Sequence, residues 1–486
     1  MSRESQSGLD PWVRRELPEA PTPKGFGWLS VVGPGVIVLG LSIGSGEFLL
    51  GPATFVRHGL SLLWVAGAAI LLQTFFNLEL MRYTMATGEP VFTGFMRTRP
   101  SSKAWAVFYA ALYFLQSGWP AWAATAAGAI YFLGARKLAT PAEASTVYYI
   151  GVASFLLCAV VLQFGRRIER TLELLNWAMV VAILGSFIVL GVWFVPFNTW
   201  MAGVAGFVGF DVTNARFDLL PAGVDFVLLA ALAGYAGGGG VANITLSNWA
   251  RDKGYGMSEH AGYIPAAVGG KKVNLAHNGF TFDPTPDAMR RWRGWWRIVR
   301  ADQWGVFFTG AMLGMVLPAL LYVTFLERGN DIRGLGIAAA LASAVGERAG
   351  PLLAGAIAFL GAWMLLKTQL DTVEAMTRAV TDIVWTGSRR ARQWEDVRVV
   401  YYAVLVAVAA WGMVALRMAQ PIVLLQLGAN VASGVFVIAS LHLLYINTTL
   451  LPPELRPGWG RRAMLVCMAL FYGFFVTMSV SRLLGA

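Results

Sequence analysis

Charged residues are scarce in this chain. Asp, Glu, Lys and Arg together make up 13% of its 486 residues, whereas soluble proteins contain about 25%. Hydrophobic residues make up 57% and gather into repeated runs of about 20 residues, which is the length an α-helix needs to cross a bilayer. The composition therefore excludes an ordinary soluble domain and predicts an all-α polytopic membrane protein.

Cysteine is also scarce, and the motifs of common catalytic sites are missing. The two cysteines, Cys158 and Cys467, each lie inside an apolar run, so we expect small buried hydrophobic residues rather than a disulfide or a metal pair. There is no P-loop, no nucleophile elbow, no Rossmann fingerprint after a strand and no cluster at metalloprotease spacing. We expect neither an enzyme nor an ATP-driven pump, and no cofactor.

Apolar runs bounded by polar or Pro/Gly-rich connections predict eleven spans. They lie near 28–56, 61–85, 104–133, 145–164, 171–194, 222–249, 302–326, 352–385, 398–416, 421–446 and 462–483. When the N-terminal tail, 1–27, is placed in the cytoplasm, cytoplasmic connections hold 27 of the 38 Lys and Arg residues and the other side holds 9. Because Lys and Arg resist translocation, this bias predicts a cytoplasmic N-terminus and an external C-terminus.

The net charge of +11 follows from this asymmetry, so we expect no nucleic-acid partner. The lipid bilayer, most simply the plasma membrane, is the expected environment. The longest cytoplasmic connection, 250–301, ends in DAMRRWRGWWRIVR, a basic and Trp-rich pattern typical of a helix that lies along lipid headgroups. A lipid-facing anchor explains this segment more simply than a regulatory site does.

Two predicted spans carry helix-breaking residues at their centres. The first contains the stretch Gly44, Ser45, Gly46 and Glu47, and the sixth contains four successive glycines, 237–240. Glycine lowers helix propensity, and interrupted backbone is tolerated at membrane depth only where protein buries it or where it lines a wet cavity. The sequence thus predicts two broken helices.

The positions of the two interruptions suggest an internal repeat. The first and sixth spans are equivalent members of two five-helix halves of opposite orientation, spans one to five (28–194) and spans six to ten (222–446), followed by an eleventh span (462–483). Paired discontinuous helices in two such halves are typical of secondary transporters whose substrate binds at the bilayer midplane.

Three segments of the chain resemble the Nramp family of divalent-metal transporters. The likeness is strongest in GPGVIVLGLSIGSGEFLLGPATFVRHG and the following LLWVAGAAILLQTFFNLELMRYTMATGEPVFTGF, and QPIVLLQLGANVASGVFVIASLHLLYINTTLL resembles the family's tenth span. The resemblance implies a leucine-transporter-type fold, made of two inverted five-helix repeats plus an eleventh helix. It also implies a metal-cation substrate.

The family binds metal through Asp-Pro-Gly-Asn in span one and Met-Pro-His in span six. The resemblance places the substrate site at Gly44, Ser45, Gly46, Glu47, Gly239, Gly240 and Asn243. Of the family's motif residues only Gly46 and Asn243 are kept, because Gly44 stands in place of the Asp and Gly240 in place of the Met. Thioethers select softer metals, whereas Glu47 and Asn243 offer hard oxygen ligands. We therefore expect a hard divalent cation such as Mg²⁺.

The residues leave alternatives open. Glu47 is costly in hydrocarbon, so we expect it to face the cavity as a cation ligand or proton carrier, unless it pairs with a Lys or Arg. Four glycines also suit a roomy pocket for a small organic solute, carried with sodium or protons. A transport-inactive sensor or scaffold is the remaining alternative.

The eighth predicted span is unusually polar. Lys367, Asp371, Glu374 and Arg378 follow at spacings of three or four residues, so they share one helical face. They either neutralise one another or line a route for a coupling ion, a proton or sodium, in which Lys367, Asp371 and Glu374 are candidates. His442 in span ten is a further candidate for proton gating, with a hydrogen-bonded packing role as its alternative.

Overall fold

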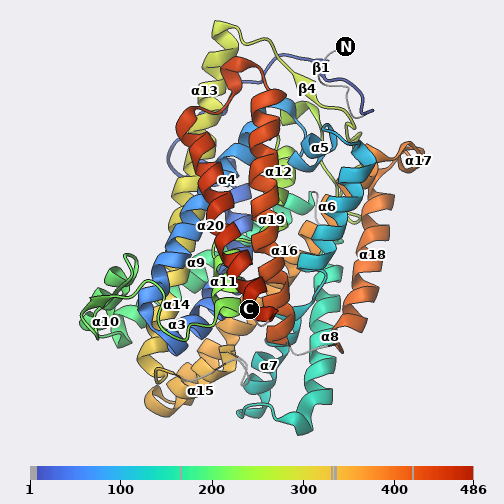
Figure 1. The fold of residues 1–486 in the computed structure, drawn as a ribbon. Helices are drawn as coiled ribbons and strands as arrows, with labels where there is room; N and C mark the ends of the chain where they lie inside the picture. The colour runs from blue at the N-terminus through green and yellow to red at the C-terminus, as the bar shows by residue number, and fades with distance from the viewer. Residues whose placement is uncertain (1–7, 165–166, 330–331, 333–336, 419–420, 485–486) are drawn as a thin grey trace.

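The computed structural model describes residues 8–164, 167–329, 332, 337–418 and 421–484; residues 1–7 of the predicted tail lie outside them. The described chain is a bundle of long helices (Figure 1). Its N-terminus lies at the same end as β1, β4, α13 and α17, whereas α3, α10 and α15 lie at the opposite end. The connections predicted to share the cytoplasmic side thus lie together.

The first span is one continuous helix. After η2 (Gly25–Gly27) and α1 (Trp28–Val31), it runs through α2 (Pro34–Ser42), the π-helical segment η3 (Ile43–Leu50) and α3 (Gly51–His58). The predicted break at GSGE is wrong, because the helix widens there instead of unwinding. The Gly51 N–H donates to the carbonyl of Gly46, five residues back, which is the π-helical pattern, rare in proteins and frequent at functional sites.

Spans two to five follow, and the third is divided. The elements are η4 (Leu60–Leu62), α4 (Leu63–Thr87), α5 (Val91–Met96), α6 (Ser102–Ser117), α7 (Ala121–Ala135), η5 (Pro141–Glu143), α8 (Ala144–Val161) and α9 (Ile168–Phe194). The predicted continuous span 104–133 is wrong, since α6 and α7 are separate helices. Pro120 has no N–H and cannot continue the helix, and the freed Gly118 carbonyl accepts a hydrogen bond from Trp411 Nε1 at 2.8 Å.

The sixth span is broken as predicted. It follows α10 (Phe197–Gly206) and the antiparallel pair β2 (Phe210–Asp211) and β3 (Arg216–Phe217). Five residues, 236–240, separate the end of α11 (Phe226–Tyr235) from the start of α12 (Val241–Lys253). Residues 237–240 have φ values of 97°, 139°, 116° and 48°. Side chains with a Cβ rarely adopt these angles, so the run of glycines is what allows the chain to cross the gap.

The rest of the chain completes the bundle. Its elements are η6 (Gly256–His260), β4 (Phe280–Thr281), which pairs in parallel with β1 (Val13–Arg14), α13 (Pro286–Arg300), η7 (Ala301–Phe308), α14 (Thr309–Phe325), α15 (Ile337–Ala349), α16 (Pro351–Gly387), α17 (Arg389–Arg392), α18 (Val397–Ala415), α19 (Pro421–Thr449), η9 (Pro453–Leu455) and α20 (Trp459–Leu483). The basic α13 runs without interruption into η7 and α14. The sequence did not predict α15, which lies in a segment that we read as a connection.

Within the described residues, nine helices are long and apolar enough to cross a membrane. The eleven predicted spans differ from these nine by the third and the sixth, each of which is divided into two shorter helices. In the most apolar stretch of the first span all residues are buried, whereas in the corresponding stretch of the span that contains α8 only 22% of the residues are buried. The first span therefore lies at the centre of the bundle. Cys158 is buried as expected, but Cys467 is exposed because it lies on the outer side of α20.

Candidate functional site

The interruption in span six is held by side chains from other spans. Gln73 Nε2 of α4 donates to the carbonyl of Ala236 at 2.6 Å, and the N–H of Gly237 donates to Glu47 Oε1 at 3.0 Å. These bonds satisfy backbone groups that have lost their helical partners. Glu47 therefore joins span one directly to the break in span six.

The second half of the interruption is held in the same way. Gln116 of α6 donates to the carbonyl of Gly239 at 2.9 Å and accepts from the N–H of Val241 at 3.0 Å. Asn243 Oδ1 accepts from the N–H of Gly239 at 2.7 Å, and its amide donates to Asn77 Oδ1 at 3.0 Å. Both ends of the Asn243 amide group are therefore hydrogen-bonded at the N-terminal end of α12.

Two buried oxygens beside the interruption have no hydrogen-bond partner within the described residues. One is Oε2 of Glu47, whose other oxygen accepts from Ser42 and Gly237, and the other is Oε1 of Gln73. A Cβ atom placed on Gly237 would lie 3.1 Å from Gln73 Oε1. Both side chains are fully buried. Unpartnered buried acceptors are costly, and here the two side chains that carry them, Glu47 and Gln73, both lie beside the same glycine.

A small cavity lies beside the break, at Gly238. It is lined by Leu41, Ser45, Tyr113, Gln116, Ser117, Trp122, Tyr235, Gly238, Ala242, Thr372 and Ala375. It offers about 10 Å³ to the centre of a water molecule, which is room for about one water. Trp122 Nε1 donates to Ser45 Oγ at 3.0 Å across it. Glu47 is not among its lining residues, so the structure separates the carboxylate from this cavity.

Gly44 and Gly240, which the Nramp resemblance places in the substrate site, are in close contact with neighbouring side chains. A Cβ on Gly44 would lie 2.0 Å from Thr368 Oγ1, and one on Gly240 would lie 2.3 Å from Gln116 Oε1. Thr368 and Gln116 therefore occupy the space that larger side chains would need. Within the described residues, no group of three or more His, Cys, Asp or Glu side chains could hold a metal.

Replacing Gly46 with Ala is expected to destabilise the protein by about 1–3 kcal/mol, the usual cost of overpacking. The new Cβ would lie 2.4 Å from the backbone carbonyl oxygen of Tyr235, which cannot swing away as a side chain can. The matched control is Gly434→Ala on α19, where no atom lies within 4 Å of the new Cβ. Thermal unfolding in detergent measures both variants, and equal melting temperatures would contradict this account of Gly46.

The polar face of α16 is divided between two sets of partners. Near its middle, Lys367 Nζ bonds Asp371, which also accepts from Asn176 of α9 at 3.3 Å. One turn further, Glu374 accepts from Arg378 Nε at 2.5 Å and from Trp249 Nε1 of α12 at 2.8 Å. The four side chains therefore do not form one continuous ladder.

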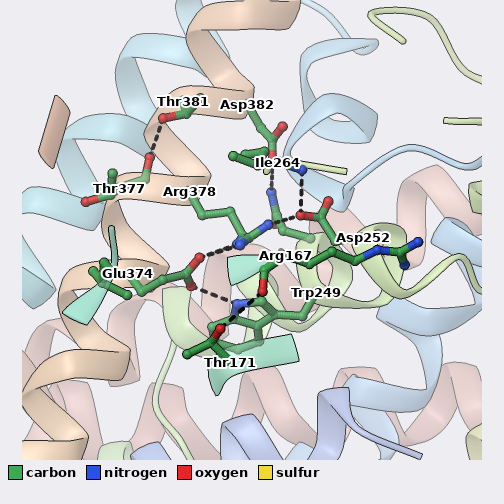
Figure 2. Close-up of polar contacts among 12 residues, drawn as sticks. Arg167, Thr171, Trp249, Asp252, Ile264, Glu374, Thr377, Arg378, Thr381 and Asp382 are labelled. Atoms are coloured by element: carbon green, nitrogen blue, oxygen red, sulfur yellow. Dashed lines mark hydrogen bonds and ion pairs between the residues drawn. The ribbon is translucent and has the colours of Figure 1, made fainter. Parts of the chain in front are cut away.

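Figure 2 shows the second set, which joins α12 to α16. Arg378 bonds Asp252, whose Oδ2 also accepts from the N–H of Ile264 at 3.0 Å. Nearby, Arg251 bonds Asp382 at 2.7 Å. All of these charged side chains are buried. Asp252, Arg251 and Asp382 were not predicted as site residues, because the sequence marks them only by the charge at the end of span six and in span eight.

His442 lies apart from the interruption. Its ring nitrogens bond Thr98 Oγ1 and the Tyr109 hydroxyl, each at 2.9 Å. The ring stacks on Phe95 of α5, with centroids 4.2 Å apart. Its observed contacts are with α5, α6 and the segment between them. Gln116 and Trp122 are further residues of the site that sequence reasoning missed, because they lie in a run that we read as an unbroken apolar span.

Comparison with known proteins adds evidence on the fold. No protein-family model matches the chain, and no curated protein matches its sequence. The chain is similar to crystal structures of the Eremococcus coleocola manganese transporter. For the H236A mutant the TM-score is 0.64 at 16% identity, covering 99% of this chain and 90% of that one. For a complex with an aromatic bis-isothiourea compound it is 0.63 at 14% identity, covering 96% and 90%.

The broken sixth span, the buried first span and this likeness define the class. The chain is an integral, multi-pass membrane protein with the leucine-transporter-type fold. Within that class, its fold is the Nramp-type fold seen in the manganese transporter, although the sequences are only 15–16% identical.

Proposed function

We propose that this chain is a secondary transporter that moves a hard divalent metal cation, such as Mg²⁺, by alternating access around spans one and six. The observation that supports this best is Oε2 of Glu47, a buried carboxylate oxygen with no hydrogen-bond partner within the described residues. An uncompensated carboxylate at the centre of a bundle is costly, and a cation beside it would remove that cost.

The ligand chemistry favours a hard cation. The Glu47 carboxylate, through Oε1, and Gln73 Oε1 both lie beside Gly237, and carboxylate and amide oxygens are ligands that Mg²⁺ and Ca²⁺ prefer. Mg²⁺ commonly keeps several waters and uses only one or two carboxylates, which fits one Glu. Asn243 becomes a third oxygen ligand when its bond to the N–H of Gly239 opens. The family's soft thioether ligand has no counterpart at Gly240.

The interruption supplies the movable part. Ala236 and the four glycines join α11 to α12, and the backbone of this segment is held by bonds from η3, α4 and α6. When a cation takes over Glu47 or Asn243, these bonds to Gly237 and Gly239 change partners. α12 is fastened to α16 by the buried ion network, so we expect the two helices to move together. We further propose that a proton or sodium serves as the coupling ion. The N-terminus would lie in the cytoplasm and the C-terminus outside, and the two repeats would cover residues 28–194 and 222–446.

The experiment that tests the proposed function is uptake into proteoliposomes. We expect Mg²⁺, and Mn²⁺ as its spectroscopic substitute, to enter vesicles containing the protein faster than protein-free vesicles. Amino acids and amines are measured in the same preparation as non-metal substrates. If neither cation is taken up while one of the organic solutes is, the proposed substrate class is wrong. If none of them moves, the protein is a transport-inactive sensor or scaffold.

A small organic solute is the second candidate because of the cavity. Its walls combine Trp122, Tyr113 and Tyr235 with the amide of Gln116 and three hydroxyl side chains, and no charged residue lines it. Aromatic faces and uncharged hydrogen-bonding groups are typical of sites for small organic molecules. The cavity as it stands holds about one water, so a solute would need the surrounding helices to separate.

A further inference from the structure

The basic helix α13 is the first part of the helix that forms span seven. Together α13, η7 and α14 run from Pro286 to Phe325, which is 40 residues, or about 60 Å at 1.5 Å per residue. The hydrocarbon core of a bilayer is only about 30 Å thick. The helix is therefore long enough to cross the hydrocarbon and to continue through the headgroup layer at the end where α13 lies (Figure 1).

One face of α13 is a stripe of exposed arginines. It consists of Arg290, Arg293, Arg297 and Arg300, whose spacings of three and four residues place them on the same side of the helix. The buried residues of α13 lie on the opposite side and are Trp292, Trp295, Ile298 and Val299. The arginine stripe therefore points away from the bundle.

Only the arginine of the stripe that lies farthest from the span has carboxylate partners. Arg290 pairs with Asp287 at 2.7 Å and with Glu19 of the N-terminal segment at 3.0 Å. Within the described residues, Arg293, Arg297 and Arg300 form no ion pair, and Arg300 Nε donates only to the carbonyl of Trp296, at 3.4 Å. Protein carboxylates thus leave the three charges nearest to the span uncompensated.

The apolar residues that follow place these charges at headgroup depth. Trp304 comes four residues after Arg300 and is half-buried, and tryptophan is enriched where hydrocarbon meets water. Arg300 and Arg297 lie about 6 and 10 Å from Trp304 along the helix axis. Because the headgroup layer is about 5–8 Å deep on each side and arginine side chains are long, both guanidinium groups can reach lipid phosphates.

The beginning of α20 extends the same basic surface. The guanidinium of Arg461 lies over the ring of Trp296, 4.5 Å from its centroid, so the start of α20 lies beside α13. There Trp459 is 85% exposed and Arg462 is exposed as well. An exposed tryptophan next to an exposed arginine is typical of a membrane–water interface.

We propose that Arg293, Arg297 and Arg300, together with Arg462, bind the phosphate groups of anionic phospholipids such as phosphatidylglycerol. Guanidinium groups bind phosphate oxygens through paired hydrogen bonds, and uncompensated positive charges at headgroup depth attract anionic lipids. A lipid fits better than a soluble acidic partner because the stripe ends directly at the aromatic residues of the span. The inference does not depend on which cargo is carried.

The test compares two lipids in thermal unfolding of the detergent-solubilised protein. Mixed micelles with phosphatidylglycerol should raise the melting temperature of wild type by about 2 °C or more above its value with the same amount of phosphatidylcholine. The variant Arg293→Gln/Arg297→Gln/Arg300→Gln should lose at least half of this difference. In phosphatidylcholine it should melt like wild type, because the three side chains have no ion pair to lose.

The matched control removes three exposed positive charges around α17, at the same end of the bundle (Figure 1), in Lys272→Gln/Arg389→Gln/Arg390→Gln. It should keep the full response to phosphatidylglycerol, and inorganic phosphate should not replace the lipid.

The proposal is wrong if wild type melts at the same temperature in both lipids, or if inorganic phosphate stabilises it equally. It is also wrong if the α13 variant keeps more than half of the response, or if the control variant loses as much of it. A lower melting temperature of the α13 variant in phosphatidylcholine would show that these arginines hold the protein together instead of binding lipid.

Discussion

Replacing Glu47 with Gln is expected to lower cation uptake into proteoliposomes by at least about tenfold, which corresponds to about 1.4 kcal/mol of cation binding. Gln has nearly the same size and keeps an oxygen that can accept from the N–H of Gly237, a bond of 3.0 Å in the native protein. It removes the negative charge that the cation would neutralise. The change therefore separates the charge of Glu47 from its packing.

The control for this variant is Glu259→Gln, a carboxylate on the exposed part of η6. It should transport at the wild-type rate. Both variants are compared by thermal unfolding, and Glu47→Gln should melt no lower than wild type because it relieves an uncompensated buried charge. Uptake of Mn²⁺ that is unchanged in Glu47→Gln would remove Glu47 from the cation site.

Replacing Arg378 with Met is expected to destabilise the protein by about 3–5 kcal/mol, the usual cost of removing one member of a buried ion pair. Arg378 is fully buried and bonds both Asp252 and Glu374 (Figure 2). Met has a similar length and is apolar, so it keeps much of the packing while leaving two carboxylates without their shared cation. Thermal or urea unfolding in detergent measures the loss.

A matched control is Arg390→Met on α17, an exposed arginine, which should change stability by less than about 0.5 kcal/mol. The double variant Arg378→Met/Glu374→Gln should recover part of the loss, because the carboxylate that loses its arginine is then gone, whereas Asp252 keeps Arg251 as a partner at 2.6 Å. If Arg378→Met and Arg390→Met unfold at the same temperature, the network in Figure 2 does not hold α12 against α16.

Nine of the eleven spans and the break in span six could be read from local signals within the described residues. Each span is an apolar run of its own, and four glycines in succession act on the backbone wherever they lie. The break predicted at Gly44 and Gly46 was wrong for a physical reason. A glycine in a helix either loosens the backbone or makes room for a neighbour, and here Thr368 and the carbonyl of Tyr235 occupy that room. Those neighbours are distant in sequence.

The partners that buried charged residues find on other helices could not be predicted from the sequence either. Spacing along α16 predicted that Lys367 could meet Asp371 and that Glu374 could meet Arg378, and both pairs are present. Nothing in the spacing shows that Asn176 approaches the first pair or that Asp252 approaches the second. Such contacts depend on how helices cross. The division of span three at Pro120 did carry a local signal, the Gly-Trp-Pro sequence that follows Gln116 and Ser117.

The most direct test of the central claim is an anomalous difference map from crystals of the wild-type protein soaked in Mn²⁺, used as a substitute for Mg²⁺. We expect one peak beside Gly237, within about 2.0–2.3 Å of Oε2 of Glu47, the range of metal–oxygen bonds for such cations. We also expect that the peak is lost in Glu47→Gln crystals. A peak in the cavity between Ser45 and Trp122 that persists in Glu47→Gln would show that Glu47 does not bind the cation.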